Sequence, residues 1–145
     1  MSRPYYVLDT GALLAYAQGV EVIGETLVEV ADAGGSVVVP LVCLLEAYSL
    51  LDHAEHDYLQ MLRQNPAVRV VSPVLRTDQV DDCAMIGGMA RHTGRLGAGH
   101  AAYVALVSSA GIVTSRADQL RQVLGDGWPI VEVRVSPNRP RATID

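Results

Sequence analysis

The sequence predicts an α/β domain in which a central, mainly parallel sheet of about five strands is covered by helices on both faces. Five short apolar runs recur along the chain, and helical patterns fill the intervals between them. Half of the 145 residues are hydrophobic and only 19% are charged, so the chain should fold as a packed globule. We expect one domain over residues 1–135 and an extended or disordered tail over residues 136–145, which carry two prolines and two arginines.

The strands are the first elements to place. The apolar runs that predict them are residues 5–8, 36–39, 68–71, 111–114 and 129–133. Strands that alternate with helices indicate parallel pairing, because a parallel pair needs a long crossover connection.

The spacing of apolar residues and the signals at helix ends predict the helices in the first half of the chain. Residues 20–33 place apolar side chains at helical spacing with three glutamates on the other face, and Gly34-Gly35 ends this amphipathic helix. Pro40 then suits the first turn of a helix over residues 41–51. That helix is apolar on nearly every face, so we expect it to be buried or to form an interface. A shorter helix is predicted over residues 58–64.

The second half continues the same rhythm. A helix is predicted from about residue 77 to residue 92, followed by a glycine-rich loop over residues 94–99. Residues 100–110 are small and apolar, which favours a helix packed close to the sheet.

Composition excludes several classes of protein. No apolar run reaches about 18 residues and no signal peptide is evident, so we expect a cytoplasmic protein without a membrane span. The chain has no lysine, which excludes Schiff-base chemistry and a P-loop. Cys43 and Cys83 lack metal-ligand spacing and are expected to be isolated buried thiols. A net charge of −5 argues against broad coating of nucleic acid but leaves room for a local phosphate or metal site.

Two acids mark a candidate site. Asp9 directly follows the first predicted strand, and Glu46 is the only charge between Pro40 and Leu51. Both lie early in an element that follows a strand, so both can point into the crevice at the carboxyl edge of the sheet. Paired carboxylates there suit Mg²⁺ or Mn²⁺. Two other interpretations stay open: Asp9 or Thr10 as a helix cap, and Glu46 paired with an arginine.

At these residues the chain resembles the PIN domain family, of the kind found in VapC toxins of toxin–antitoxin pairs. The similar segments lie in the family's order at residues 6–15, 40–47, 100–105 and 111–115. The resemblance implies a PIN-like α/β/α sandwich and an endoribonuclease that depends on Mg²⁺ or Mn²⁺, in which acids hold the metal beside the scissile phosphate. It also implies an RNA substrate, an antitoxin partner and a homodimer, with the helix over residues 41–51 and the segment around residues 58–62 as candidate interfaces. Asp9 and Glu46 match the family's first and second acids.

The family's third and fourth acids are missing. Ala98 stands at the position of the third, and Arg116 stands at that of the fourth, after Thr114-Ser115. We therefore expect weak or absent metal binding, and we hypothesise that the Arg116 guanidinium bridges Asp9 and Glu46.

Several neighbours could compensate for the missing acids. Asp118 is a candidate replacement ligand and catalytic residue, with a helix cap as the alternative. Thr10, Thr114 and Ser115 could bond a carboxylate or a water, or simply stabilise turns.

Two functions remain open from the sequence. One is a VapC-like protein with impaired or atypical RNA cleavage. The other is a catalytically silent PIN scaffold that binds RNA or protein.

Overall fold

A five-stranded parallel sheet forms the centre of the molecule. The computed structural model describes residues 5–73 and 80–136, and the strand order is β3-β2-β1-β4-β5. The strands are β1 (Tyr5–Leu8), β2 (Ser36–Pro40), β3 (Val68–Val71), β4 (Gly111–Thr114) and β5 (Ile130–Glu132). The predicted α/β class and all five strand positions are confirmed to within two residues.

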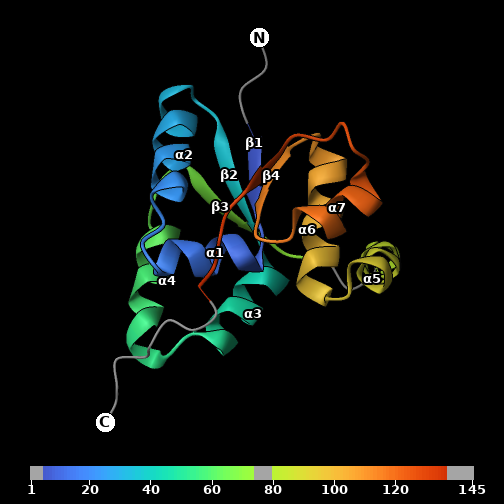
Figure 1. The fold of residues 1–145 in the computed structure, drawn as a ribbon, viewed down its shortest axis with the longest axis horizontal. Coiled ribbons are helices and arrows are strands. Elements are labelled where there is room, and N and C mark those ends of the chain that lie inside the picture. Colours follow the sequence, from blue (N-terminus) through green and yellow to red (C-terminus); the bar gives the residue numbers. More distant parts are fainter. Residues whose placement is uncertain (1–4, 74–79, 137–145) are drawn as a thin grey trace.

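Helices cover the sheet on both faces (Figure 1). They are α1 (Thr10–Ala17), α2 (Glu21–Asp32), α3 (Leu41–Leu50), α4 (His56–Arg63), α5 (Asp81–Thr93), α6 (Leu96–Ser108) and α7 (Ala117–Leu124), with a 3₁₀ turn, η1 (His53–Glu55), before α4. Helices α1, α2 and α4 lie on one side and α5, α6 and α7 on the other, while α3 contacts both α1 and α6. No helix within the described residues is long and apolar enough to cross a membrane.

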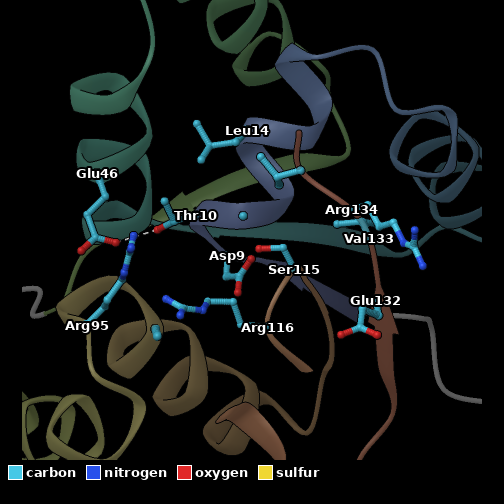
Figure 2. Close-up of a pocket in the computed structure, with 13 residues that line it drawn as sticks. Asp9, Thr10, Leu14, Glu46, Arg95, Ser115, Arg116, Glu132, Val133 and Arg134 are labelled. Atoms are coloured by element: carbon cyan, nitrogen blue, oxygen red, sulfur yellow. Dashed lines mark hydrogen bonds between the residues drawn. The ribbon is translucent and has the colours of Figure 1, made fainter. Parts of the chain in front are cut away.

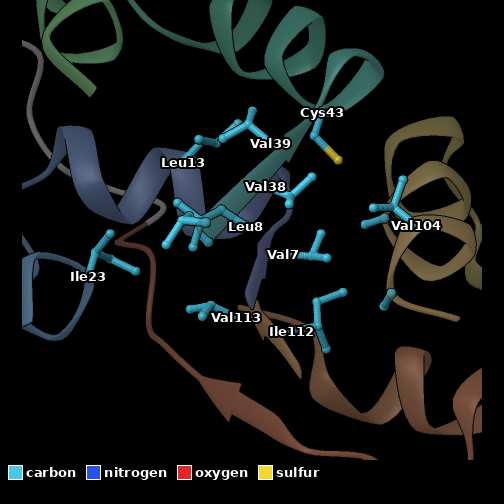
Figure 3. Close-up of a cluster of buried hydrophobic side chains, with 14 of the residues drawn as sticks. Val7, Leu8, Leu13, Ile23, Val38, Val39, Cys43, Val104, Ile112 and Val113 are labelled. Atoms are coloured by element: carbon cyan, nitrogen blue, oxygen red, sulfur yellow. The ribbon is translucent and has the colours of Figure 1, made fainter. Parts of the chain in front are cut away.

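The core explains why β1 is central. Its residues Val7 and Leu8 are fully buried, and they pair with β2 and β4 on either side. Figure 3 shows the side chains from both faces that pack around them, among them Leu13, Ile23 and Val104. Strands buried on both faces read as continuous apolar runs, which is why the sequence located them.

The predicted loop over residues 94–99 is wrong. Gly94 ends α5 with a positive φ of 85°, and α6 begins two residues later at Leu96. Gly97 and Gly99 are therefore helical. A Cβ on Gly99 would lie 2.6 Å from the Ala90 nitrogen and from the Ile86 carbonyl oxygen, so this glycine lets α5 and α6 pack closely.

Some of the other expectations are confirmed and some are wrong. Cys43 is buried as predicted, but Cys83 is exposed, because it lies on the outer face of α5. Helix α3 is only partly buried, since Leu45 and Leu50 are exposed. The tail prediction falls almost wholly on residues 137–145, outside the described part of the chain.

Candidate functional site

A pocket of about 560 Å³ opens at the carboxyl edge of the sheet, where α/β proteins bind ligands. Its wall comes from the start of α1, the middle of α3, the start of α6, the end of β4 and the end of β5 (Figure 2). Four of its lining residues stand at the positions that the resemblance aligned with the family's acids: Asp9, Glu46, Ala98 and Arg116. Segments far apart in sequence thus converge as expected.

Asp9 is held by the first turn of α1. It is the N-cap residue, and the Ala12 N–H donates a 3.0 Å hydrogen bond to its Oδ1. Burial raises the pKa of Asp9 to about 6, although hydrogen bonds from the Thr114 side chain and the Ala12 and Gly11 backbones oppose the rise. The nearby Glu46 charge adds to the rise. Asp9 therefore caps α1 and also lines the pocket.

Glu46 is held from two other elements. The Thr10 hydroxyl donates a 2.7 Å hydrogen bond to its Oε1, and the Gly97 N–H donates a 3.3 Å bond to its Oε2. A Cβ on Gly97 would collide with the Glu46 carboxylate and lie 2.8 Å from the Thr10 Oγ1. Glycine at the first turn of α6 is thus what makes room for Glu46. The alternative in which Glu46 pairs with an arginine is not found among the described residues.

The two hydroxyl residues at the end of β4, Thr114 and Ser115, have separate roles. Thr114 is fully buried and its Oγ1 accepts a 2.9 Å hydrogen bond from the Arg116 N–H, which stabilises the turn. Ser115 lines the pocket and packs so closely on Gly11 that a Cβ there would collide with its Oγ.

The bridge expected from Arg116 is not formed. Across residues 5–73 and 80–136, Arg116 makes no ion pair with Asp9 or Glu46. Its side chain is exposed at the pocket. Both carboxylates accept hydrogen bonds from α1 or α6 instead.

Asp118 does not reach the site. It is fully exposed in the first turn of α7 and pairs with Arg121 at 3.6 Å, and it is not among the residues that line the pocket. It makes no side-chain cap either, because the N-cap of α7 is Arg116. Asp82, on α5, accepts a 2.9 Å hydrogen bond from the Tyr103 hydroxyl, away from the pocket.

Three charged pocket residues escaped the sequence reasoning. Arg95 precedes α6 directly, and Glu132 and Arg134 lie at and beyond the end of β5. A signal for the last two was present, since Glu132 lies near the end of the fifth predicted strand and Arg134 follows it, and carboxyl ends of parallel strands share one edge. No signal pointed to Arg95, because its place depends on where α6 begins.

The donor set does not fit a magnesium centre. Within the described residues no three His, Cys, Asp or Glu side chains are grouped so that they could hold one metal ion. Asp9 and Glu46 each already accept hydrogen bonds from protein donors. Mg²⁺ gives up its water reluctantly and needs well-placed oxygen ligands, so two engaged carboxylates beside guanidinium groups make a poor site.

Three arginines stand among the charged residues of the pocket. The charged side chains that line it cancel formally: Arg95, Arg116 and Arg134 against Asp9, Glu46 and Glu132. This balance contrasts with the net charge of −5 for the whole chain. None of the three arginines forms an ion pair within the described part of the chain, so their donors are available to a ligand.

Comparisons with known proteins bear on the fold. No family model matches the sequence, and no curated protein matches it. The structure is similar to that of VapBC2 from Rickettsia felis, solved bound to a DNA fragment from the promoter, with a TM-score of 0.61 and 13% identity. That match covers 90% of this chain and 99% of the other.

A second similar structure is PAE2754 from Pyrobaculum aerophilum. Its TM-score is 0.51 at 18% identity, and the match covers 88% of this chain and 91% of the other. The two similarities confirm the PIN-like α/β/α fold that the sequence predicted.

Proposed function

We propose that this chain is a VapC-like PIN protein that has lost metal-dependent RNA cleavage and acts by binding. One observation carries the proposal: Ala98 and Arg116 line the same pocket as Asp9 and Glu46, so the two missing acids are missing from the site itself. An acidic centre that attracts a divalent cation is thereby reduced to two carboxylates facing guanidinium groups.

The electrostatic reason is direct. Replacing a carboxylate by a guanidinium changes the local charge by two, and like charges close together repel strongly in a partly buried pocket. A divalent cation entering this pocket meets Arg95 and Arg116 where a metal site needs oxygen ligands. Without the metal, nothing lowers the pKa of an attacking water or polarises the phosphate.

A second candidate is an impaired or atypical ribonuclease that uses Mg²⁺ or Mn²⁺. Asp9 and Glu46 keep their places in one pocket, with Thr10 and Ser115 beside them, and this favours the candidate. The two candidates share a fold and differ in whether the two remaining acids hold a metal.

A cognate antitoxin is the proposed partner. The similar structure is that of the VapBC2 complex with a promoter fragment, and this similarity supports an antitoxin partner for the present chain. Exposed apolar side chains on α3 and α4 give such a partner, or a second copy of the chain, a surface to cover: Leu45, Leu50, Tyr58 and Met61. Leu59 and Leu62, from the same predicted interface segment, belong to the core instead.

The test is cleavage of a structured RNA in Mn²⁺ by the wild type, by the wild type with EDTA, and by Asp9→Ala. We expect identical RNA patterns in all three samples. Cleavage that disappears both with EDTA and with Asp9→Ala would contradict the proposal and establish the impaired ribonuclease.

A further inference from the structure

We infer that the pocket binds the phosphate group of a nucleotide, held by the guanidinium groups of Arg95 and Arg116. The inference deepens the proposed function, because it names the ligand class of the same pocket.

The two arginines approach the pocket from different elements. Arg95 precedes α6 and Arg116 precedes α7. Figure 2 draws both side chains extending toward the side of the pocket that holds Asp9 and Glu46, whereas Arg134 lies on the β5 side. Guanidinium groups donate paired, planar hydrogen bonds that match phosphate oxygens.

Neither arginine is committed to a protein acceptor. No ion pair or side-chain hydrogen bond of Arg95 or Arg116 occurs within the described residues, although two carboxylates line the same pocket. Those carboxylates are instead bonded to Thr10, Gly97 and Ala12. Two unpaired cations facing a shared cavity can exchange water for an anion without breaking an internal contact.

Three helices begin at the pocket, and one of these helix starts is left without a carboxylate cap within the described residues. The first residues of α1 and the third residue of α6 line the pocket, as does the N-cap of α7. The N-terminus of a helix carries a partial positive charge and unpaired N–H groups. Asp9 already occupies the start of α1 and Glu46 bonds the Gly97 N–H of α6, so the start of α7, beside Arg116, is the one that no carboxylate caps among the described residues.

The rest of the pocket has room for what the phosphate is attached to. A cavity of about 560 Å³ lies within the usual range for small-molecule sites, and a bare phosphate would leave most of it empty. Leu14, Val133 and Val135 give the lining an apolar part. A sugar and base can lie against this apolar part while the phosphate reaches the arginines.

The experiment is calorimetric titration in EDTA at low salt, with three probes: inorganic phosphate, a nucleoside 5′-monophosphate and a short single-stranded RNA. We expect the monophosphate to bind and to bind more tightly than phosphate. Tighter binding of the RNA than of the monophosphate would make an RNA phosphate the source, and equal binding would make it a free nucleotide.

Variants distinguish specific binding by Arg95 and Arg116 from a general effect of positive charge. Arg95→Ala and Arg116→Ala should each weaken binding by about tenfold or more, because each loses charged hydrogen bonds. Arg116→Lys should restore only part of the affinity, since lysine cannot bind bidentately. The matched control is Arg121→Ala, which removes the same charge from α7 at a position that does not line the pocket. It should leave the affinity unchanged.

Two results would overturn the inference: no binding of any phosphate probe, or equal weakening by Arg121→Ala. Because EDTA is present throughout, these results are independent of metal-dependent cleavage. Cleavage in Mn²⁺ together with arginine-dependent binding in EDTA would overturn the proposed function and leave the phosphate site intact.

Discussion

Replacing Asp9 by asparagine should stabilise the protein at neutral and alkaline pH. Asp9 is 5% exposed, and burial raises its pKa from 3.8 to about 6. Below pH 3.8 the carboxyl group is protonated in the folded and the unfolded chain, so it makes no pH-dependent difference. Between pH 3.8 and about 6 the unfolded chain ionises this carboxyl while the folded state keeps it protonated, so stability falls over this range. The loss is complete above about pH 6, where the folded state holds a buried charge.

The magnitude follows from the two pKa values. The difference between 3.8 and about 6 corresponds to about 3 kcal/mol of unfolding free energy lost by pH 8. Asparagine carries no charge and caps a helix as well as aspartate does, so it keeps the bond to the Ala12 N–H. We therefore expect Asp9→Asn to raise the unfolding free energy by up to about 3 kcal/mol at pH 8 and by less than about 1 kcal/mol at pH 4.

The assay is urea unfolding of the wild type and the variant at pH 8, 6 and 4. Asp118→Asn is the control, because that carboxylate is fully exposed on α7 and its replacement should show no comparable gain. A variant that is less stable than the wild type at pH 8, or a gain that is equal at all three pH values, would refute the argument that burial of the charge opposes folding.

The remaining predictions concern packing and thiol access. Gly97→Ala should lower the unfolding free energy by about 1–3 kcal/mol, because the new Cβ displaces the Glu46 carboxylate from its hydrogen bonds. Gly88→Ala, in the middle of α5 with open space around it, should instead raise it by about 0.5–1 kcal/mol in the same urea titration. In the folded protein a thiol reagent should modify Cys83 rapidly and Cys43 only after unfolding, since Cys43 is buried and its thiol donates to the Gly97 carbonyl oxygen at 3.0 Å. Equal rates for both thiols would contradict this placement.

The strands and the first two acids could be predicted because their signals are local. A strand that is buried on both faces must be apolar throughout, and an acid directly after it stands out against that background. Asp9 and Glu46 were found in this way, and the structure places them in one pocket. The Ala98 and Arg116 positions came from the family resemblance and line the same pocket.

What could not be predicted depends on how helices pack. Gly97 and Gly99 were interpreted as loop residues, yet they are helical and small because Glu46 and α5 approach them closely. Because of that error the start of α6 was not predicted, and neither was the place of Arg95 directly before it. The partners of Glu46 could not be predicted either, because the Thr10 hydroxyl and the Gly97 N–H reach it from two other helices.

The most direct test of the central claim is a calorimetric titration of Mn²⁺ into the wild type and into the double variant Ala98→Asp with Arg116→Asp. Both positions line the pocket, so the double change gives it two further carboxylates beside Asp9 and Glu46 and removes one guanidinium. We expect no measurable Mn²⁺ binding by the wild type and clear binding by the double variant. Equal binding by the two proteins would contradict the claim that these two positions decide whether the pocket holds a metal.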